Sequence, residues 1–410
     1  MSRLLAVCSR SSNVFGHISM GLVNQGYAGE VAFWLAMRGR FGIITDGDDG
    51  FAINWLHRQT ATSFRGKIGI GFNASRPMDK QVFTTTIRRK QIAVAIDAPK
   101  DVCLYIRELI ENENDLELGV KNSLLKIKIP FVLVAATRTG LLAARSQGRK
   151  PLSWGKINND LEGYYFASQS GVLGEDAQYL GSVLPGEMVF VNQSGAWHQM
   201  VNPRADQTRC LHEDLFQKRQ DNVASGRPIY QLRQAVGHLE GRFFLDTVKL
   251  PRYKNVLAIQ IPDGGLHFLL GFRDRTGYRI DPGAIVKNRY ALPALGRENA
   301  QRIRVKYNVV EDAVRGKKII LIDDLVRSGT HMRLVSSWLR ECGALEVHGV
   351  VSGILCHVCP YGNDDYTPYY EGKPRTAEDL GLDSLTYPPK DELLKVLSTK
   401  NRPRCGNCLC

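Results

Sequence analysis

Two adjacent acids, Asp323 and Asp324, are the residues of this sequence best placed to do chemistry. They end an apolar run at 319–322, and a short loop containing Gly and Thr follows, then a helical pattern. An apolar, β-branched run bounded in this way is typical of a buried parallel strand. The free amides at the start of a helix can bind phosphate, and acids at a strand tip can hold ribose hydroxyls or a phosphate-bound Mg²⁺. The segment therefore predicts a phosphate-binding corner of a β-α-β unit.

The composition indicates a globular chain suited to anionic ligands. Its 410 residues are enough for two or three domains, and 43% of them are hydrophobic and 23% charged. No apolar run is long enough to span a bilayer, so no membrane partner is expected. The net charge of +13 suits an anionic ligand. Because the Lys and Arg residues are scattered rather than grouped in blocks, phosphate chemistry is favoured over specific nucleic-acid binding.

The residue patterns divide the chain into two expected domains. Short strands are predicted throughout the first half, at 42–44, 67–72, 91–96, 131–135, 163–167 and 188–191. With helical patterns only at 19–37 and 102–111, this half predicts an α+β sandwich. A polar break at 202–206 precedes alternating helices and buried strands, as in a doubly wound sheet. We therefore predict domains at 1–205 and 206–410, the second ending in a cysteine-bearing tail.

The second half resembles one family of enzymes. The segment around Asp323 resembles the phosphoribosyl diphosphate (PRPP) loop of type I phosphoribosyltransferases. Three further segments, at 261–265, 287–290 and 304–308, resemble in order those of the glutamine PRPP amidotransferases. The resemblance implies an α/β type I phosphoribosyltransferase domain. It also implies a PRPP site made of Asp323, Asp324, Arg327, Ser328, Gly329, Thr330, Asp263, Gly264, Gly265, Lys287 and Lys306.

The resemblance assigns a role to each part of this site. Asp323 and Asp324 would hold the ribose hydroxyls or a metal, and the loop at 327–330 would cradle the 5-phosphate. Lys287 and Lys306 would neutralise pyrophosphate, although an ordinary solvated position is an equally open interpretation of each lysine. Mg²⁺ would assist the departure of pyrophosphate.

The first half resembles the N-terminal-nucleophile glutaminase domain of the same family, through segments at 143–152, 167–169 and 185–187. Several residues that the chemistry needs are nevertheless replaced. Ser2 stands at the position of the nucleophilic Cys, Phe72 at that of the carboxylate-binding Arg, and Asp97-Ala98 at that of an oxyanion-binding Asn-Gly pair. A serine nucleophile is chemically possible. The combined losses predict a degenerate glutaminase.

Four of the nine cysteines match the ligands of the iron-sulfur members of the family. They are Cys210, Cys359, Cys405 and Cys408, the last two forming a C-x-x-C motif. The resemblance implies a [4Fe-4S] cluster, for which four thiolates are the usual ligand set. A zinc site made of the same four thiolates, or four unrelated thiols, are the alternatives. Cys356 and Cys410 lie nearby in the sequence as further thiols. The other three cysteines are expected to be buried small hydrophobic residues, namely Cys8, Cys103 and Cys342.

Two departures from the family affect the expected reaction. Gly265 replaces a metal-contacting Ser, and residues 291–296 replace the loop that closes over PRPP. We therefore expect a phosphoribosyltransferase that uses ammonia or another nitrogen nucleophile, such as a nucleobase. The alternative is a non-catalytic iron-sulfur scaffold or regulator.

The family also implies a homo-oligomer, either a dimer or a tetramer, and a cytoplasmic location. The N-terminal segment contains Arg3, Arg10 and several serines, and no acid precedes Glu30. It could be an organellar transit peptide. A first strand at 4–7 followed by a helix is the favoured interpretation.

Overall fold

The protein is described from a computed structural model, in which the chain divides into two compact units. The described residues are 2–10, 13–25, 32–38, 43–48, 65–74, 81–157, 162–224, 226–251, 255–262, 264–288, 300–361, 373–398 and 403–410. The first unit is Met1–Cys210 with Tyr361–Asn363, and the second is Leu211–Pro360 with Asp364–Cys410. The sequence placed the boundary at 205/206, whereas the contacts divide the chain after Cys210.

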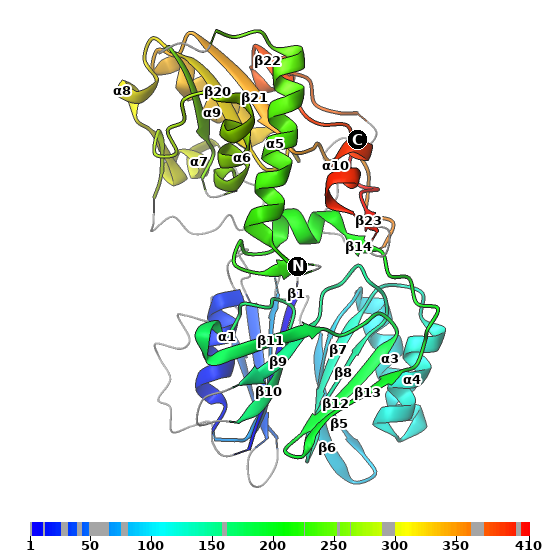
Figure 1. Ribbon diagram of the computed structural model, residues 1–410. Helices are drawn as coiled ribbons and strands as arrows, with labels where there is room; N and C mark the ends of the chain where they lie inside the picture. Colours follow the sequence, from blue (N-terminus) through cyan, green and yellow to red (C-terminus); the bar gives the residue numbers. More distant parts are fainter. Residues whose placement is uncertain are drawn as a thin grey trace. The chain divides into compact units, whose positions relative to one another are not determined.

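The first unit contains two antiparallel sheets (Figure 1). One has the strand order β11-β9-β10-β1-β4-β2-β3 and the other β13-β12-β8-β7-β6-β5. The strands of the first sheet are β1 (Ser2–Ser9), β2 (Ala32–Arg38), β3 (Ile43–Asp48), β4 (Ile68–Ala74), β9 (Ser153–Ile157), β10 (Gly163–Ala167) and β11 (Ala177–Ser182). Those of the second are β5 (Val82–Ile87), β6 (Lys90–Asp97), β7 (Val132–Ala136), β8 (Gly140–Arg145), β12 (Glu187–Asn192) and β13 (Gly195–Met200).

Alternation along the strands explains the four layers of this unit. Leu4 and Ala6 of β1 belong to the core between the sheets, whereas Leu5 and Val7 pack beneath α1 (Phe15–Gln25). Helices α3 (Lys100–Glu113) and α4 (Leu116–Lys126) cover the outer face of the other sheet. Both faces of each sheet are therefore buried, as expected for a sandwich flanked by helices.

One sequence prediction in this unit is wrong. The helix expected at 19–37 is instead α1 followed by the strand β2. Phe33, Leu35 and Met37 pack under α1, and Ala36 faces the second sheet. A segment that is apolar on both faces does not reveal its period, so the sequence could not separate a buried helix from a buried strand.

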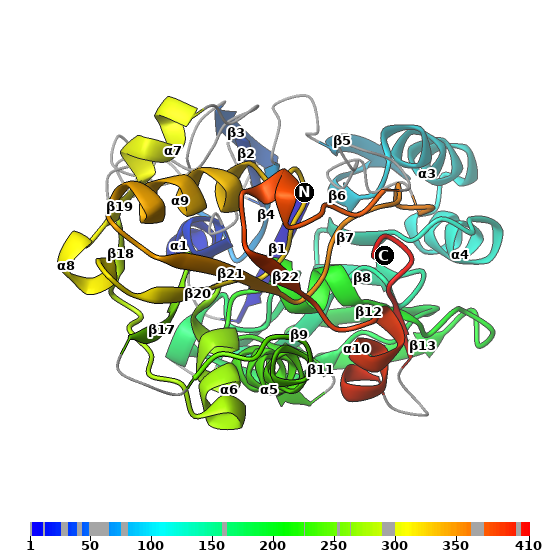
Figure 2. The same cartoon turned by 90° about the horizontal axis from the view of Figure 1, so that it is seen from above.

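The second unit is built on a parallel sheet in the order β17-β20-β21-β22. Its strands are β17 (Val256–Gln260), β20 (Lys318–Asp323), β21 (Glu346–Val351) and β22 (Ser384–Thr386). Helices cover both faces, as Figure 2 shows for α9 on one side and α5 and α6 on the other. The helices are α5 (Ile229–Thr247), α6 (Leu266–Thr276), α7 (Ala300–Lys306), α8 (Glu311–Val314), α9 (Thr330–Glu341) and α10 (Lys390–Leu397). The predicted β-α-β corner is β20-α9-β21.

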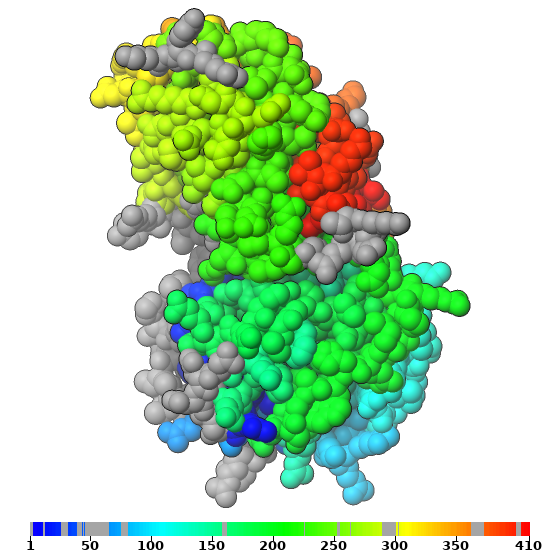
Figure 3. All heavy atoms as spheres, in the orientation of Figure 1, coloured from blue at the N-terminus to red at the C-terminus, as the bar shows by residue number. Residues whose placement is uncertain are grey.

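The C-terminal segment packs on this unit. Leu393 and Leu397 of α10 share a core with α5, and in Figure 3 the red helix α10 lies against the green surface of α5. Arg404, in β23 (Arg404–Cys405), lies 3.4 Å from the Asp214 carboxylate in the π-helix η4 (Glu213–Gln217), and Lys218 lies 2.8 Å from the same group. All three side chains are at most 4% exposed. The buried ion pairs of Asp214 with Lys218 and Arg404 therefore hold the C-terminal segment against the second unit.

The architecture confirms the predicted fold class, an N-terminal-nucleophile-like sandwich followed by a type I phosphoribosyltransferase fold. Among the described residues, no helix is both long and apolar enough to cross a membrane.

Candidate functional site

The predicted PRPP loop connects β20 to α9 at the carboxyl edge of the parallel sheet. Gly329 caps α9 with φ of +80°, a left-handed conformation that favours glycine. The Ser328 and Thr330 hydroxyl oxygens lie 2.9 Å apart, and the Thr330 amide donates to Ser328 at 3.3 Å. Arg327 is exposed. The loop therefore presents hydroxyls and helix-terminal amides, the groups that bind a phosphate.

A Cβ atom at Gly329 would lie 2.3 Å from Leu380. A side chain at this position would therefore meet the protein core. For this reason, substitution of Gly329 would test folding rather than phosphate binding.

Asp323 and Asp324 lie in different surroundings although they are adjacent. Asp324 lies next to Gly264, where a Cβ atom would be 2.8 Å from its Oδ2 atom, and the charge of Arg233 acts on it. Asp323 is influenced instead by Lys306. The Asp324 amide donates to Asp323 Oδ1 at 2.9 Å. Successive residues leaving a strand point to opposite faces, which explains the separation.

The two acids hold protons more tightly than ordinary aspartates. Burial raises the pKa of Asp323 well above its usual value, and the Asp324 charge raises it further. Burial likewise raises the pKa of Asp324, although Arg233 and His331 oppose the increase. Two carboxyl groups this close resist ionising together, and cations or hydroxyl donors relieve the repulsion. The pair is therefore suited to a ligand that supplies such groups.

In the loop at 261–265, the described residue Gly264 lies against the Asp324 carboxylate. The Ile261 amide of this loop donates to the Ile322 carbonyl at 2.9 Å, and Gly265 precedes the first turn of α6. A Cβ atom at Gly265 would lie 2.8 Å from the Ile322 carbonyl oxygen. The backbone here leaves no room for the Ser that the family carries. The N-termini of α6 and α9 thus lie at the ends of the neighbouring strands β17 and β20.

The two predicted lysines lie in the described part of the chain, whereas the loop that replaces the one expected to close over PRPP does not. Lys287 lies in β18 (Ile285–Lys287), directly opposite Tyr307 of β19 (Tyr307–Val309), which follows Lys306. The hairpin therefore brings the two lysines to one end, and the Lys306 charge reaches Asp323. Asp263 and the replaced lid at 291–296 lie outside the described residues.

Sequence reasoning missed a group of buried polar residues on the α5 face of the site. Arg233 and Glu240 lie on α5, Gln260 ends β17, and Ser352 follows β21. All four are at most 7% exposed. Arg233 donates to the backbone carbonyls of Leu215 and Lys218, each at 2.9 Å. The signal available in the sequence was the seven-residue spacing of Arg233 and Glu240, which places both on the apolar face of α5.

In the first unit, two of the expected glutaminase positions, Phe72 and Asp97, hold side chains that are buried or paired. β1 begins at Ser2. The Phe72 ring lies in the core between the sheets, where it cannot bind a carboxylate. Asp97, at the expected oxyanion position, forms an ion pair of 2.7 Å with Lys150, and both side chains are largely buried. A paired carboxylate does not stabilise an oxyanion.

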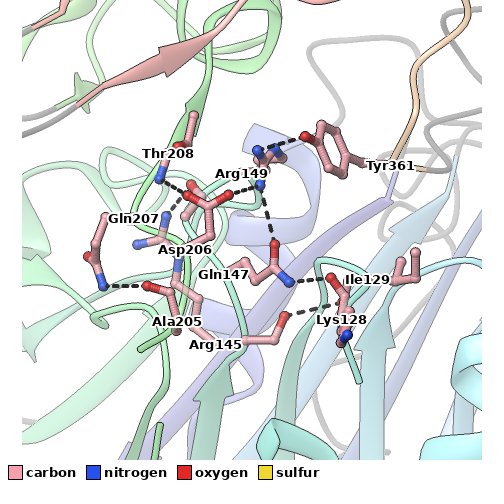
Figure 4. Close-up of polar contacts among 12 residues, drawn as sticks. Lys128, Ile129, Arg145, Gln147, Arg149, Ala205, Asp206, Gln207, Thr208 and Tyr361 are labelled. Carbon is pink, nitrogen blue, oxygen red and sulfur yellow. Dashed lines mark hydrogen bonds and ion pairs between the residues drawn. The ribbon is translucent and has the colours of Figure 1, made fainter. Parts of the chain in front are cut away.

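The segment at 145–149 forms a polar cluster within the first unit (Figure 4). Arg149 donates to Asp206 at 2.7 Å and to the Tyr361 hydroxyl at 2.9 Å, and its guanidinium lies 3.6 Å from the Tyr361 ring centroid. Arg145 donates to the Gly148 carbonyl at 2.6 Å. The segment that resembles the family therefore holds its own loop, Asp206 and Tyr361 in place through its two arginines.

Three of the four expected cluster ligands are close together within the second unit. Burial raises the pKa of the Cys408 thiol to about 12, and the charges of Cys359 and Cys405 add to the increase. Those three thiols are therefore neighbours within the second unit, and Cys210 lies in β14 (Arg209–Cys210), which pairs with β23, the strand of Cys405. Among the described residues, no group of three or more His, Cys, Asp or Glu side chains is arranged to hold a metal ion.

The remaining cysteines have separate environments. Cys356 and Cys410 form a disulfide with Cα atoms 5.5 Å apart. Cys8 and Cys103 are buried as expected, and Cys342 is partly buried against a core.

Comparison with known proteins points to the same two folds. No family model matches the chain. An amidophosphoribosyltransferase of Bacillus subtilis is 28% identical over 308 residues, covering 71% of this chain and 61% of the relative. Another, from Methanocaldococcus jannaschii, is 25% identical over 425 residues, covering 95% of this chain and 82% of the relative. The solved structure of glutamine PRPP amidotransferase from B. subtilis complexed with ADP and GMP has a TM-score of 0.83 at 21% identity. It covers 99% of this chain and 96% of that chain.

The fold and the acid-bearing loop define a chain that joins an N-terminal-nucleophile fold to a type I phosphoribosyltransferase fold. With the sequence likeness over most of its length, the chain is similar to the amidophosphoribosyltransferases and diverges from them in sequence. The match takes in less than two thirds of the Bacillus relative's own length, so its activity does not transfer with the fold.

Proposed function

We propose that the chain is a PRPP-dependent phosphoribosyltransferase that uses ammonia or another nitrogen nucleophile, such as a nucleobase, and does not hydrolyse glutamine. The observation that carries this proposal is the acid pair Asp323-Asp324 beside the N-termini of α6 and α9. Two helix N-termini suit the 5-phosphate and the pyrophosphate of PRPP, and the acids between them suit its ribose.

Each group has a role in the transfer. The amides and hydroxyls of Ser328 and Thr330 bind the 5-phosphate, and the carboxylates of Asp323 and Asp324 accept hydrogen bonds from the ribose hydroxyls. The nitrogen nucleophile attacks C1 while the bond from C1 to the pyrophosphate oxygen breaks. Pyrophosphate leaves with the electron pair, and the nucleophile loses a proton. Lys287 and Lys306 offset the negative charge of the leaving group.

Two inorganic cofactors belong to the proposal. Mg²⁺ would neutralise charge on the leaving pyrophosphate, and the oxygen donors of this edge are of the kind that it prefers. A [4Fe-4S] cluster would use Cys359, Cys405 and Cys408, whose thiols are neighbours, together with Cys210. The cluster would tie the C-terminal tail to the fold rather than take part in the transfer.

The loss of glutamine hydrolysis is supported by the first unit. A core Phe72 removes the carboxylate-binding cation, and the Asp97–Lys150 ion pair occupies the oxyanion position. A transferase without its own ammonia source needs a nucleophile from solution or another protein. Free ammonia or a nucleobase is therefore the proposed nucleophile.

The test is pyrophosphate release from PRPP and Mg²⁺ in the presence of ammonium, glutamine or individual nucleobases. Release with ammonium or one nucleobase, but not with glutamine, is the expected result. Asp324→Asn should abolish it. If PRPP is consumed with none of these nucleophiles, the chain is better described as a non-catalytic iron-sulfur scaffold. The absent Ser at Gly265 already favours that second candidate.

A further inference from the structure

The sandwich of the first unit contains a cavity of about 410 Å³ at one end. Its walls are the ends of β1, β9 and β10 and the turn between β12 and β13. Because β1 runs from Ser2 to Ser9, the cavity at its far end is roughly 23 Å from the position expected for the glutaminase nucleophile. Pockets of roughly 300–1,000 Å³ are typical of small-molecule sites. The cavity is therefore a candidate site separate from both sites described above.

Arg10 holds two walls of this cavity in place. Its Nε atom donates to the Gln193 carbonyl at 2.6 Å, and its Nη1 atom lies 3.1 Å from the Glu162 carboxylate. Gln193 lies in the turn of the second sheet, whereas Glu162 directly precedes β10 of the first sheet. The Arg10 amide also donates to the Glu162 carbonyl at 2.9 Å. The cavity is therefore formed without a ligand, and the charge of Arg10 is already balanced.

A third wall is a row of side chains on three neighbouring strands of the first sheet. Lys156 of β9 lies directly opposite Tyr164 of β10, and Tyr164 lies directly opposite Cys8 of β1. Residues opposite each other in antiparallel strands point to the same face, with Cβ atoms roughly 5 Å apart. The Tyr164 ring stacks on Trp154, with the ring centroids 6.5 Å apart, which restrains it. The row therefore brings an amine and a phenol hydroxyl to the same cavity.

Both of these donors are available to a ligand. Within the described part of the chain, the Lys156 amine forms no ion pair or hydrogen bond, and the Tyr164 hydroxyl has no hydrogen-bond partner. Burial raises the pKa of the Cys8 thiol to about 11, so the third member of the row is uncharged. Since Arg10 is paired with Glu162, Lys156 gives the cavity one unbalanced positive charge.

We propose that this cavity binds a small organic monocarboxylate, with one carboxylate oxygen accepting from the Lys156 amine and the other from the Tyr164 hydroxyl. A carboxylate has two acceptor oxygens and carries the single negative charge that the cavity lacks. A phosphate suits the site less well, because it carries more charge and is usually bound by an arginine fork or by helix-terminal amides. The remaining volume holds the organic part of the acid. The inference is independent of the proposed transferase.

Calorimetric titration of the whole protein tests this site with benzoate and the larger 2-naphthoate as probes. Benzamide has the shape of benzoate without its charge, and phenyl phosphate carries a dianionic group instead. Lys156→Met keeps the aliphatic stem and removes the amine, whereas Tyr164→Phe keeps the ring on Trp154 and removes only the hydroxyl. The matched control is Lys126→Met, which changes an exposed lysine in the last turn of α4. Thermal melting confirms that each variant is folded.

We expect both acids to bind the wild type with a Kd of about 1 mM or below. The Kd should rise at least about tenfold in Lys156→Met and about threefold in Tyr164→Phe, and it should be unchanged in Lys126→Met. Failure of both acids to bind up to about 20 mM, or wild-type affinity in Lys156→Met, would overturn the inference. Binding of benzamide or phenyl phosphate as tight as that of benzoate would overturn the assignment to a carboxylate.

Discussion

At the scale of single residues, Glu240 makes stability depend on pH. Its pKa rises from 4.5 to about 8 on folding, so the native state keeps a proton that the unfolded chain releases. This contribution to stability is complete below about pH 4.5 and is lost as the pH rises through about 8. We predict that the wild type loses stability across that window relative to Glu240→Leu. Denaturant melts at several pH values measure this, and parallel curves for the two proteins would refute the buried neutral acid.

Glutamine hydrolysis is the second test at this scale. Because Asp97 is paired with Lys150 and Phe72 occupies the core, we predict no glutamate release above the rate without protein. Ser2→Ala should therefore change nothing in an enzyme-coupled glutamate assay. Glutamate release that Ser2→Ala abolishes would show a working serine nucleophile and contradict the prediction.

The residue scale also shows what the sequence could reveal. Asp323, Asp324 and the loop to Thr330 form one continuous segment, so their motif was recognisable. Glu240 and Ser352 are 112 positions apart, and an acid on a helix is usually solvated. Their contact depends on the packing of α5 on the sheet. The Lys150–Asp97 pair was hidden for the same reason, since it joins separate segments of the sandwich.

At the scale of elements, the ionic anchor of the C-terminal tail should contribute strongly to stability. Asp214→Asn would leave two buried cations, Lys218 and Arg404, without their shared counter-charge, and we predict a loss of about 3–5 kcal/mol in the free energy of unfolding. The matched control is Arg242→Met, because its pair with Glu392 joins α5 to α10 at a more exposed site. That variant should cost less than about 1 kcal/mol. If denaturant titrations show equal losses of unfolding free energy in Asp214→Asn and Arg242→Met, the buried ion pairs do not stabilise the protein more than the exposed pair.

The tail should also depend on iron. We predict that anaerobically purified protein is brown and holds about four irons per chain, since a [4Fe-4S] cluster uses four thiolates. Cys405→Ser or Cys408→Ser should remove the colour and lower the melting temperature. Iron analysis and visible absorption measure this. A colourless protein with stoichiometric zinc would contradict it, and Cys342→Ser, remote in sequence from the motif, is the control.

The strands of the first unit also show where the pattern of apolar residues fails to predict secondary structure. The strands β4, β6, β7, β10 and β12 matched their predictions because turns bounded each apolar run. The segment containing β2 did not, because it is buried between α1 and the second sheet and has no polar face. Burial on both sides removes the alternation that distinguishes a strand.

At the scale of the whole molecule, the family and both folds follow from the sequence, whereas the acceptor does not. The order of motifs resembles that of the amidophosphoribosyltransferases, and the observed topology agrees with this resemblance. We expect the acceptor to depend on the loop at 291–296, whose sequence departs from that of the family. PRPP binding is the step that every proposed acceptor shares.

The most direct measurement is therefore titration of PRPP with Mg²⁺ into the wild-type protein by calorimetry, with Asp324→Asn as the matched control. Binding should also raise the melting temperature by mass action. We predict saturable binding by the wild type, weakened at least about tenfold in the Asn variant because a charged hydrogen bond to ribose is lost. No binding by the wild type up to millimolar PRPP would contradict the proposed transferase.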